Sequence, residues 1–276
     1  MKIYFLLFAI FFLFITTLSA QQPTLFKLWE TDTLLTTCES VFYNAKQKLL
    51  YVSNIEGVPA AKDGKGSISK VGLDGKIINR NWVTGLNAPK GLGLYKNTLW
   101  VNDIDELVAI DIKTGTITQR VKIEGAKFLN DLTISKKGVI YTSDSDMKKV
   151  FQVKDGNVST YLENFRRPNG VLAIGKDLYI LDSGKLLKAN NDKQLTTIAE
   201  GMLGSTDGIE RVSASEFIVS SWGGAVYHVQ TNGTVQQLLD TQALKINLAD
   251  IGYDAKKRIV YVPTFNKHTV VAYELR

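Results

Sequence analysis

Cysteine and histidine are nearly absent from this sequence. Cys38 is the single cysteine in 276 residues, and the two histidines are His228 and His268. One cysteine excludes an internal disulfide, a cysteine-based zinc site and covalent haem attachment. The fold must therefore depend on its apolar core, in which we expect Cys38 to be a small buried filler. Both histidines come late in the chain without an obvious serine partner, which argues against a Ser-His-Asp hydrolase.

Concentrated charge and phosphate-binding loops are missing as well. The formal net charge is +6, but the basic residues occur in ones and twos along the chain. Nucleic-acid binders gather positive charge on one face with aromatic residues between, so we expect a solvated surface and no nucleic-acid partner. The chain also has no glycine-rich phosphate loop and no G-x-S-x-G nucleophile elbow.

The first twenty residues differ from the rest. Lys2 is followed by the uncharged run "IYFLLFAIFFLFITTLSA" and then by the polar "QQPT". A basic start, an apolar middle and small residues before a break are typical of a secretory signal peptide. We predict that residues 1–20 are a signal peptide and that the protein is exported, either periplasmic or secreted. An uncleaved anchor is the alternative, because the uncharged run could nearly span a bilayer. Beyond this leader we expect no membrane contact.

A repeated unit fills the remainder of the chain. Short β-rich runs separated by Gly, Asp and Asn turns recur at intervals of roughly forty residues. Each copy has an apolar strand, a polar turn and a second strand carrying Tyr, Trp or Phe, and most continue with a hairpin. The six copies begin at Glu39, Lys90, Asn130, Asn169, Asp207 and Ala249.

Four short strands in roughly forty residues are typical of one blade of a β-propeller. The sixth copy ends one strand short, at "TVVAYELR", and the stretch "TLFKLWET" at residues 24–31 can supply the missing strand. We therefore predict an all-β fold, a six-bladed β-propeller over residues 23–276 whose ring is closed by an N-terminal strand. A linear solenoid is the alternative, but it would not need that spare strand.

The opening residues of the six copies form a column that can converge at one mouth of the central channel. Four of the six carry oxygen donors: Glu39, Asn130, Asn169 and Asp207. Hard divalent cations prefer carboxylates and amide carbonyls, and Ca²⁺ tolerates neutral ligands and irregular geometry. The column predicts a divalent metal site, most simply for Ca²⁺, with Asp131 as a neighbouring carboxylate that orients the ligands. Taken singly, each residue could instead begin a strand or form a turn.

At these residues the chain resembles the senescence-marker-protein/gluconolactonase/luciferin-regenerating-enzyme family, which is related to diisopropyl fluorophosphatase and the paraoxonases. The matching stretches are "CESVFY", "FLNDLTIS", "RRPNGVLAIGKDLYILDS" and "STDGIERV…FIVSSWGGAVYHV". The resemblance implies that Glu39, Asn130, Asn169 and Asp207 bind one catalytic divalent metal, usually calcium. It further implies that Asp207 acts as base or nucleophile in the hydrolysis of a small-molecule lactone or related ester. We expect the protein to be a monomer.

Some positions depart from the family pattern. Lys90 brings a cation into the column, where it could bind a substrate carboxylate or phosphate, point away into a salt bridge, or weaken metal binding by repulsion. His268 follows the second strand of the last copy, where a loop could reach the substrate, whereas we expect His228 to be structural. No counterpart of the paraoxonase histidine pair is visible. Trp222 and Phe265 fall at matching places and either wall a substrate pocket or pack in the core.

Three functions are compatible with these patterns. The first is an exported, metal-dependent hydrolase of a lactone or related ester. The alternative is a propeller that binds a small ligand or a protein and catalyses nothing, which the fold alone does not separate from the first. A lyase or condensing enzyme similar to strictosidine synthase would lack the metal, so the four-donor column argues against it.

Overall fold

The computed structural model describes Met1 and residues 22–276, and the predicted signal peptide otherwise lies outside the described residues. Within the described part the chain forms 24 strands and one short 3-10 helix, η1 (Gln242–Leu244). None of the helices there is of a length and hydropathy that would cross a bilayer. The strands are short because Gly, Asn and Asp turns interrupt them at regular intervals.

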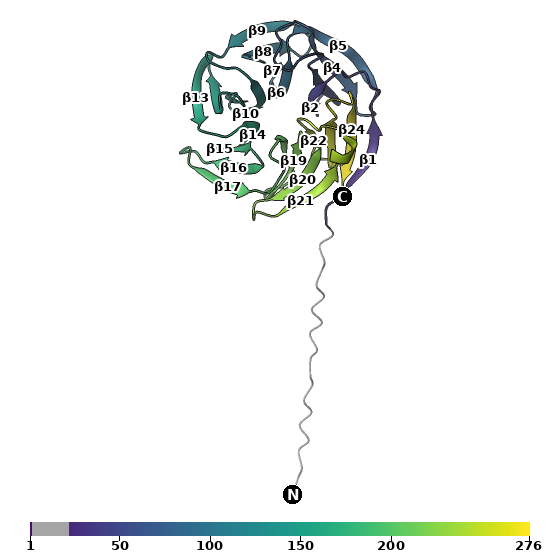
Figure 1. Ribbon diagram of the computed structural model, residues 1–276, viewed down its shortest axis with the longest axis vertical. Coiled ribbons are helices and arrows are strands. Elements are labelled where there is room, and N and C mark those ends of the chain that lie inside the picture. The colour runs from purple at the N-terminus through teal and green to yellow at the C-terminus, as the bar shows by residue number, and fades with distance from the viewer. Residues whose placement is uncertain (2–21) are drawn as a thin grey trace.

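Six four-stranded antiparallel sheets surround a common centre (Figure 1). The first blade contains β2 (Cys38–Asn44), β3 (Leu49–Asn54), β4 (Gly66–Gly72) and β5 (Ile77–Leu86). The second contains β6 (Pro89–Tyr95), β7 (Thr98–Asp103), β8 (Glu106–Asp111) and β9 (Ile117–Lys122). The third contains β10 (Leu129–Ile134), β11 (Ile140–Asp144), β12 (Lys149–Lys154) and β13 (Asn157–Glu163).

The remaining blades repeat this plan, which confirms the predicted six-bladed propeller. The fourth contains β14 (Pro168–Ile174), β15 (Asp177–Asp182), β16 (Lys185–Ala189) and β17 (Leu195–Ala199). The fifth contains β18 (Thr206–Arg211), β19 (Glu216–Ser221), β20 (Ala225–Gln230) and β21 (Val235–Asp240). The sixth contains β22 (Gly252–Asp254), β23 (Ile259–Pro263), β24 (Val270–Leu275) and β1 (Leu25–Glu30).

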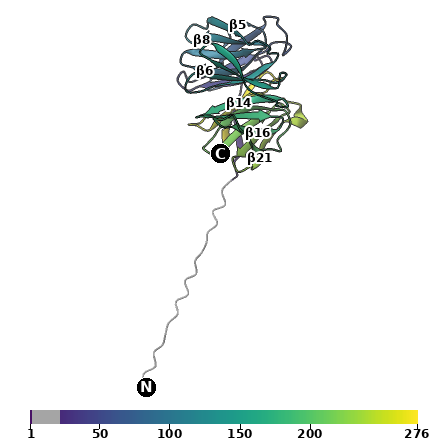
Figure 2. The same cartoon turned by 90° about the vertical axis from the view of Figure 1, so that its left-hand side faces the viewer.

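The sixth blade joins the two ends of the described chain, as the short last repeat predicts. Its strand order is β1-β24-β23-β22, so the N-terminal strand is the outer edge of the blade (Figure 1). The backbones of Thr24 and Arg276 exchange two hydrogen bonds of 3.0 Å at one end of this pairing. At the other end, the Glu30 carboxylate accepts hydrogen bonds from Thr269 Oγ1 at 2.7 Å and from Lys27 Nζ at 2.7 Å. The N-terminal strand thus completes the sixth sheet and closes the ring, which Figure 2 shows from its side.

Apolar side chains between adjacent sheets form the core. Between the first two blades, for example, Ile68, Leu99 and Val101 are fully buried. Cys38 is also fully buried, its thiol donates to the Thr269 carbonyl at 3.2 Å, and burial raises the pKa of the thiol to about 12. The cysteine is therefore an unreactive core residue, as expected from the sequence.

The inner strands share one irregularity that matters for the channel. In five of the six blades the pairing between the innermost and second strands shifts at the column residue. These bulges turn the column side chains toward the channel. A serine on the second strand accepts the N–H group of the following residue in three blades, the acceptors being Ser53, Ser143 and Ser220.

Glycine follows the column residue where two inner strands come closest. A Cβ atom on Gly170 would lie 2.3 Å from the Asp207 carbonyl oxygen, and one on Gly208 would lie 2.4 Å from Asp250 Oδ1. Both distances are too short for any side chain. The Asn169-Gly170 and Asp207-Gly208 pairs are thus explained by close strand packing and not by tight turns, since both pairs lie inside strands, β14 and β18.

Candidate functional site

The four predicted donors come together at one end of the channel. Glu39, Asn130, Asn169 and Asp207 all line a single cavity of about 430 Å³. They are contributed by β2, β10, β14 and β18, the innermost strands of four different blades. The column predicted from the sequence is therefore a ring in space.

The ring presents oxygen atoms that lack partners within the described chain. Asn169 Nδ2 donates to Asp207 Oδ1 at 3.1 Å, and Asn130 Nδ2 donates to Ser145 Oγ at 3.1 Å. These bonds engage the amide nitrogens and leave the amide oxygens available. Glu39 Oε2 and Asn169 Oδ1 are buried and have no hydrogen-bond partner among the described residues. Buried oxygens are ordinarily satisfied, so the ring has the character of an incomplete coordination shell.

The electrostatics of the ring favour a cation. Burial raises the pKa of the Glu39 carboxyl well above its usual range, repulsion from Asp207 and Asp250 raises it further, and Lys90 lowers it. Burial and the charge of Asp250 likewise raise the pKa of Asp207, while the Asn169 hydrogen bond lowers it. Two carboxylates in one low-dielectric site repel each other, and a bound cation would relieve that repulsion.

The donor set suits a hard divalent cation. Residues 22–276 contain no group of three or more His, Cys, Asp or Glu side chains placed to hold a metal. The ring instead combines two carboxylates with two amides. Ca²⁺ accepts this mixture of charged and neutral oxygens with water completing the shell, whereas zinc prefers nitrogen and sulfur. The unpartnered oxygens of Glu39 and Asn169 therefore fit a cation such as Ca²⁺.

A second polar ring lies one residue further along the inner strands. Asp131 Oδ1 accepts from the N–H of Leu132 at 2.6 Å, and its Oδ2 accepts from the N–H of Val171 at 2.7 Å. Asp250 Oδ2 accepts from Ser40 Oγ at 2.5 Å. Burial raises the pKa of Asp250 to about 7 despite this hydrogen bond. We call the four donors the upper ring and these carboxylates the lower ring. Asp131 accepts a backbone N–H group of β14, and Asp250 accepts the hydroxyl of Ser40 on β2, so Asp131 positions β14 through its backbone.

Recurring aspartates position the loops that lead into the ring. Asp103, Asp144 and Asp182 end the second strands of three blades. Each carboxylate accepts hydrogen bonds from two successive backbone N–H groups just before a column residue, such as Ala88 N at 2.8 Å, Lys127 N at 2.7 Å and Arg167 N at 2.7 Å. The loops enter the inner strands at a defined angle as a result.

Lys90 lines the cavity but its ammonium is committed to the protein. The residue is 1 % exposed, and its Nζ donates to the carbonyls of Pro59 at 2.9 Å and Ala88 at 3.0 Å. It also lies 4.3 Å from the centroid of the Phe128 ring. Burial lowers the pKa of Lys90, although Glu39 raises it. Lys90 therefore neither reaches the surface nor forms a salt bridge among the described residues, and its role toward substrate stays a prediction.

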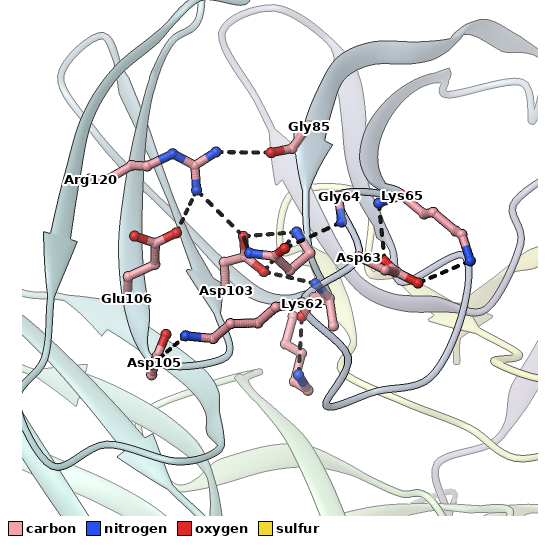
Figure 3. A network of polar contacts seen from close by, with 12 residues as sticks. Lys62, Asp63, Gly64, Lys65, Gly85, Asp103, Asp105, Glu106 and Arg120 are labelled. Atoms are coloured by element: carbon pink, nitrogen blue, oxygen red, sulfur yellow. Dashed lines mark hydrogen bonds and ion pairs between the residues drawn. The ribbon is translucent and has the colours of Figure 1, made fainter.

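The Pro59 carbonyl belongs to the loop that joins β3 to β4, and this loop is tied to the second blade. Lys62 Nζ contacts Asp105 at 2.6 Å, and the N–H of Gly64 donates to Asn87 Oδ1 at 3.3 Å (Figure 3). The loop carries Pro59 and Ile55 to the cavity wall. Contacts from a neighbouring blade thus shape this side of the pocket.

The two histidines lie elsewhere. His268 Nδ1 accepts a hydrogen bond from the backbone N–H of Thr37 at 2.8 Å, and among the described residues that line the cavity it does not appear. Its contact with substrate stays a prediction. His228 is buried, with its Nε2 3.4 Å from Glu216, which agrees with a structural role.

The cavity wall contains residues that the sequence reasoning did not single out. Phe128, Arg167 and Ser205 line it, and each lies two positions before a column residue. The same repeat alignment could therefore have identified them. Trp222 and Phe265 also line the cavity, and their rings meet edge to face with centroids 5.8 Å apart.

Comparisons with known proteins give the fold and no family. No family model matches the chain, and no curated protein does. A solved protein named provisionally as a gluconolactonase is 16 % identical, with a TM-score of 0.68 over 92 % of each chain. A streptogramin B lyase is 12 % identical, with a TM-score of 0.66 over 92 % of this chain and 98 % of its own. A chain from a nidogen–laminin complex is 16 % identical, with a TM-score of 0.63 over 79 % of this chain and 85 % of its own.

Proposed function

We propose that this protein is a divalent-metal-dependent hydrolase that opens a lactone or a related ester at the mouth of its channel, with Ca²⁺ as the metal. The observation that carries the proposal is the ring of four oxygen-bearing side chains that line the cavity, two of whose buried oxygens lack partners among the described residues. Purely structural residues at this depth would be satisfied by neighbouring groups. The fold similarity to a protein named as a gluconolactonase supports the same class.

Glu39, Asn130, Asn169 and Asp207 would hold the metal. A divalent cation bound there would polarise the substrate carbonyl and lower the pKa of a nearby water. The Asn169 amide holds one oxygen of Asp207 and leaves the carboxylate beside the cavity. We propose that Asp207 takes the proton of the attacking water as a new C–O bond forms to the carbonyl carbon. When the ring C–O bond breaks, the proton passes to the departing alkoxide and a hydroxy acid results. Attack by the Asp207 carboxylate itself is the variant of this mechanism.

The test combines metal content with turnover. Protein purified from cells that express the full-length sequence is dialysed against Ca²⁺, its bound calcium is measured, and hydrolysis of aliphatic, sugar and aryl lactones is followed. We expect one calcium ion per chain and turnover of at least one lactone class. At saturating Ca²⁺, Asp207→Asn should lower kcat by about 10²- to 10⁴-fold, the usual contribution of a catalytic acid or base.

Asp192→Asn is the matched control, because it makes the same change in an exposed turn between β16 and β17. It should leave calcium content and turnover unchanged. Bound calcium without turnover of any lactone would favour a propeller that only binds a small ligand or a protein. If neither Ca²⁺ nor another divalent cation binds, the assignment of the ring as a metal site is wrong.

We also propose that the protein is exported to the periplasm or the exterior. The support for export is the sequence of residues 1–20. The N-terminal residue of the protein recovered from the host distinguishes a signal peptide cleaved after Ala20 from a retained anchor.

A further inference from the structure

The wall above the donor ring is largely apolar. Ile55, Pro59, Phe128, Trp222 and Phe265 line it, from the first, third, fifth and sixth blades and the loops that join them. Trp222 is 44 % exposed although it is a large aromatic residue, and it packs edge to face on Phe265. An aromatic pair that lines a cavity, with one ring exposed, is a surface that an apolar ligand would cover.

The polar side chains of the wall outside the ring already have partners in the protein. Lys90 donates to two backbone carbonyls, as described above. Ser205 Oγ is 3.0 Å from Ser221 Oγ and accepts from the N–H of Gly223. Thr206 Oγ1 accepts from the N–H of Gly184, and Arg167 contacts Asp146 at 3.3 Å. In the described chain the Arg167 guanidinium, on a side chain that is 61 % exposed, and the Thr206 hydroxyl still have unused donors, so a polyhydroxylated ligand would pair only some of its hydroxyl groups with this wall.

From these two observations we propose that the site prefers lactones with an apolar alkyl or aryl substituent over sugar lactones, and that Trp222 and Phe265 bind that substituent. This proposal rests on the proposed function, because it names the substrate class of the same site. An apolar pocket rejects an added hydroxyl group by no more than about 100-fold, so the expected preference is moderate. A cavity of about 430 Å³ is large enough for a lactone ring with such a substituent.

The first experiment compares substrates. In a series from γ-butyrolactone to longer γ-alkyl lactones, kcat/KM should rise about threefold to fourfold for each methylene that reaches the wall, which is the usual effect of burying one methylene. D-Glucono-1,5-lactone should be at least about tenfold poorer than the best alkyl lactone. A flat alkyl series, or the sugar lactone as the best substrate, would overturn the preference while leaving the hydrolase proposal intact.

The second experiment separates the binding preference from catalysis. Alkyl-substituted 2-pyrrolidinones are lactams of the same shape, and their dissociation constants can be measured by calorimetry whether or not any lactone turns over. We expect tighter binding with each added methylene. If this occurs without any lactone hydrolysis, the apolar site stands and the hydrolase proposal fails. If chain length has no effect on lactam binding, the apolar site itself is refuted.

Variants test the residues named. Trp222→Ala should weaken binding of the longest lactam about tenfold or more, with little effect on the unsubstituted one, and Trp222→Phe should restore most of the loss. The Trp222 main chain keeps its hydrogen bonds with Ser205 and Asn247 in both variants. Leu244→Ala is the control, because Leu244 is an exposed apolar residue that does not line this cavity in the described chain. An equal loss for short and long lactams would show that Trp222 has only a structural role.

Discussion

Two successive rings of the channel use the same kinds of side chain for opposite purposes. In the upper ring, the buried oxygens Glu39 Oε2 and Asn169 Oδ1 have no partner among the described residues. One residue further along, Asp131 accepts two backbone hydrogen bonds, and Asp250 accepts one from Ser40. Burial and mutual repulsion raise the pKa of carboxyls in both rings. The carboxyls of both rings are therefore buried and close to like charges. Hydrogen-bond satisfaction is what distinguishes a candidate ligand from a residue that holds two strands together.

This comparison has a consequence for stability. An unpaired buried charge destabilises a fold, whereas a carboxylate that satisfies backbone donors of two strands stabilises it. Removing charge from the upper ring should therefore cost function and leave the metal-free fold no less stable. Removing a carboxylate from the lower ring should instead lower the free energy of unfolding.

The largest effect is expected for metal binding. Glu39→Gln keeps the shape of the side chain but removes one of two ligand charges, so Ca²⁺ affinity should fall by about 100-fold or more. The midpoint of urea unfolding without metal should stay the same or rise, because repulsion with Asp207 is gone. Calcium titration and unfolding in a chelator measure the two quantities, and Glu124→Gln on the surface serves as control. A metal-free protein that Glu39→Gln destabilises strongly would erase the distinction between the rings.

The next effect concerns the lower ring. Asp131→Ala leaves the N–H groups of Leu132 and Val171 without their acceptor, so the free energy of unfolding should fall by about 3 kcal/mol. Asp131→Asn retains one acceptor oxygen and should lose less. Urea denaturation in a chelator gives both values. Should the alanine variant prove as stable as the parent, the claim that Asp131 ties β10 to β14 is incorrect.

Close packing of the inner strands should give a somewhat smaller effect. Gly208→Ala places a Cβ atom 2.4 Å from Asp250 Oδ1 and 2.5 Å from the N atom of Ile251, so the backbone must shift at a cost of about 2 kcal/mol. Gly204→Ala is the matched control, because a Cβ atom there would meet nothing within 4 Å. Thermal unfolding of both variants measures the contrast, and equal stability of the two would show that the inner strands tolerate a side chain at Gly208.

The smallest effect is expected for the pH dependence of stability that comes from Glu210 on β18. Burial and the charge of Asp250 raise the pKa of Glu210 to about 8, while the N–H of Arg211 lowers it. Because the folded-state pKa lies above the unfolded value, this group's contribution to stability is complete below about pH 4.5 and is lost as pH rises through about 8. Metal-free protein should therefore lose stability over this range, and Glu210→Gln should flatten the profile. A profile that the variant leaves unchanged would assign the pH dependence to other groups.

Much of the fold could be predicted from the sequence because its causes are local. Strand alternation, polar turns and the interval of roughly forty residues identify the blades, and the missing strand of the last repeat indicates closure by residues 24–31. The column from Glu39 to Asp207 follows from the same alignment. The same alignment could also have identified the cavity residues Phe128 and Arg167, which lie two positions before Asn130 and Asn169.

Other properties depend on contacts between blades, which no single repeat contains. Lys90 occupies a column position, yet its ammonium binds the carbonyl of Pro59 from another blade, and His268 receives its hydrogen bond from Thr37 across the ring closure. Asp131 and Asp207 both lie near the start of an inner strand, but in the described chain Asp131 accepts a backbone N–H group of β14, whereas Asp207 accepts the side-chain amide of Asn169. Which side chains face the channel could be predicted from the sequence, because strand period is a local property. Which of them are hydrogen-bonded depends on the assembled ring, because their partners come from other blades.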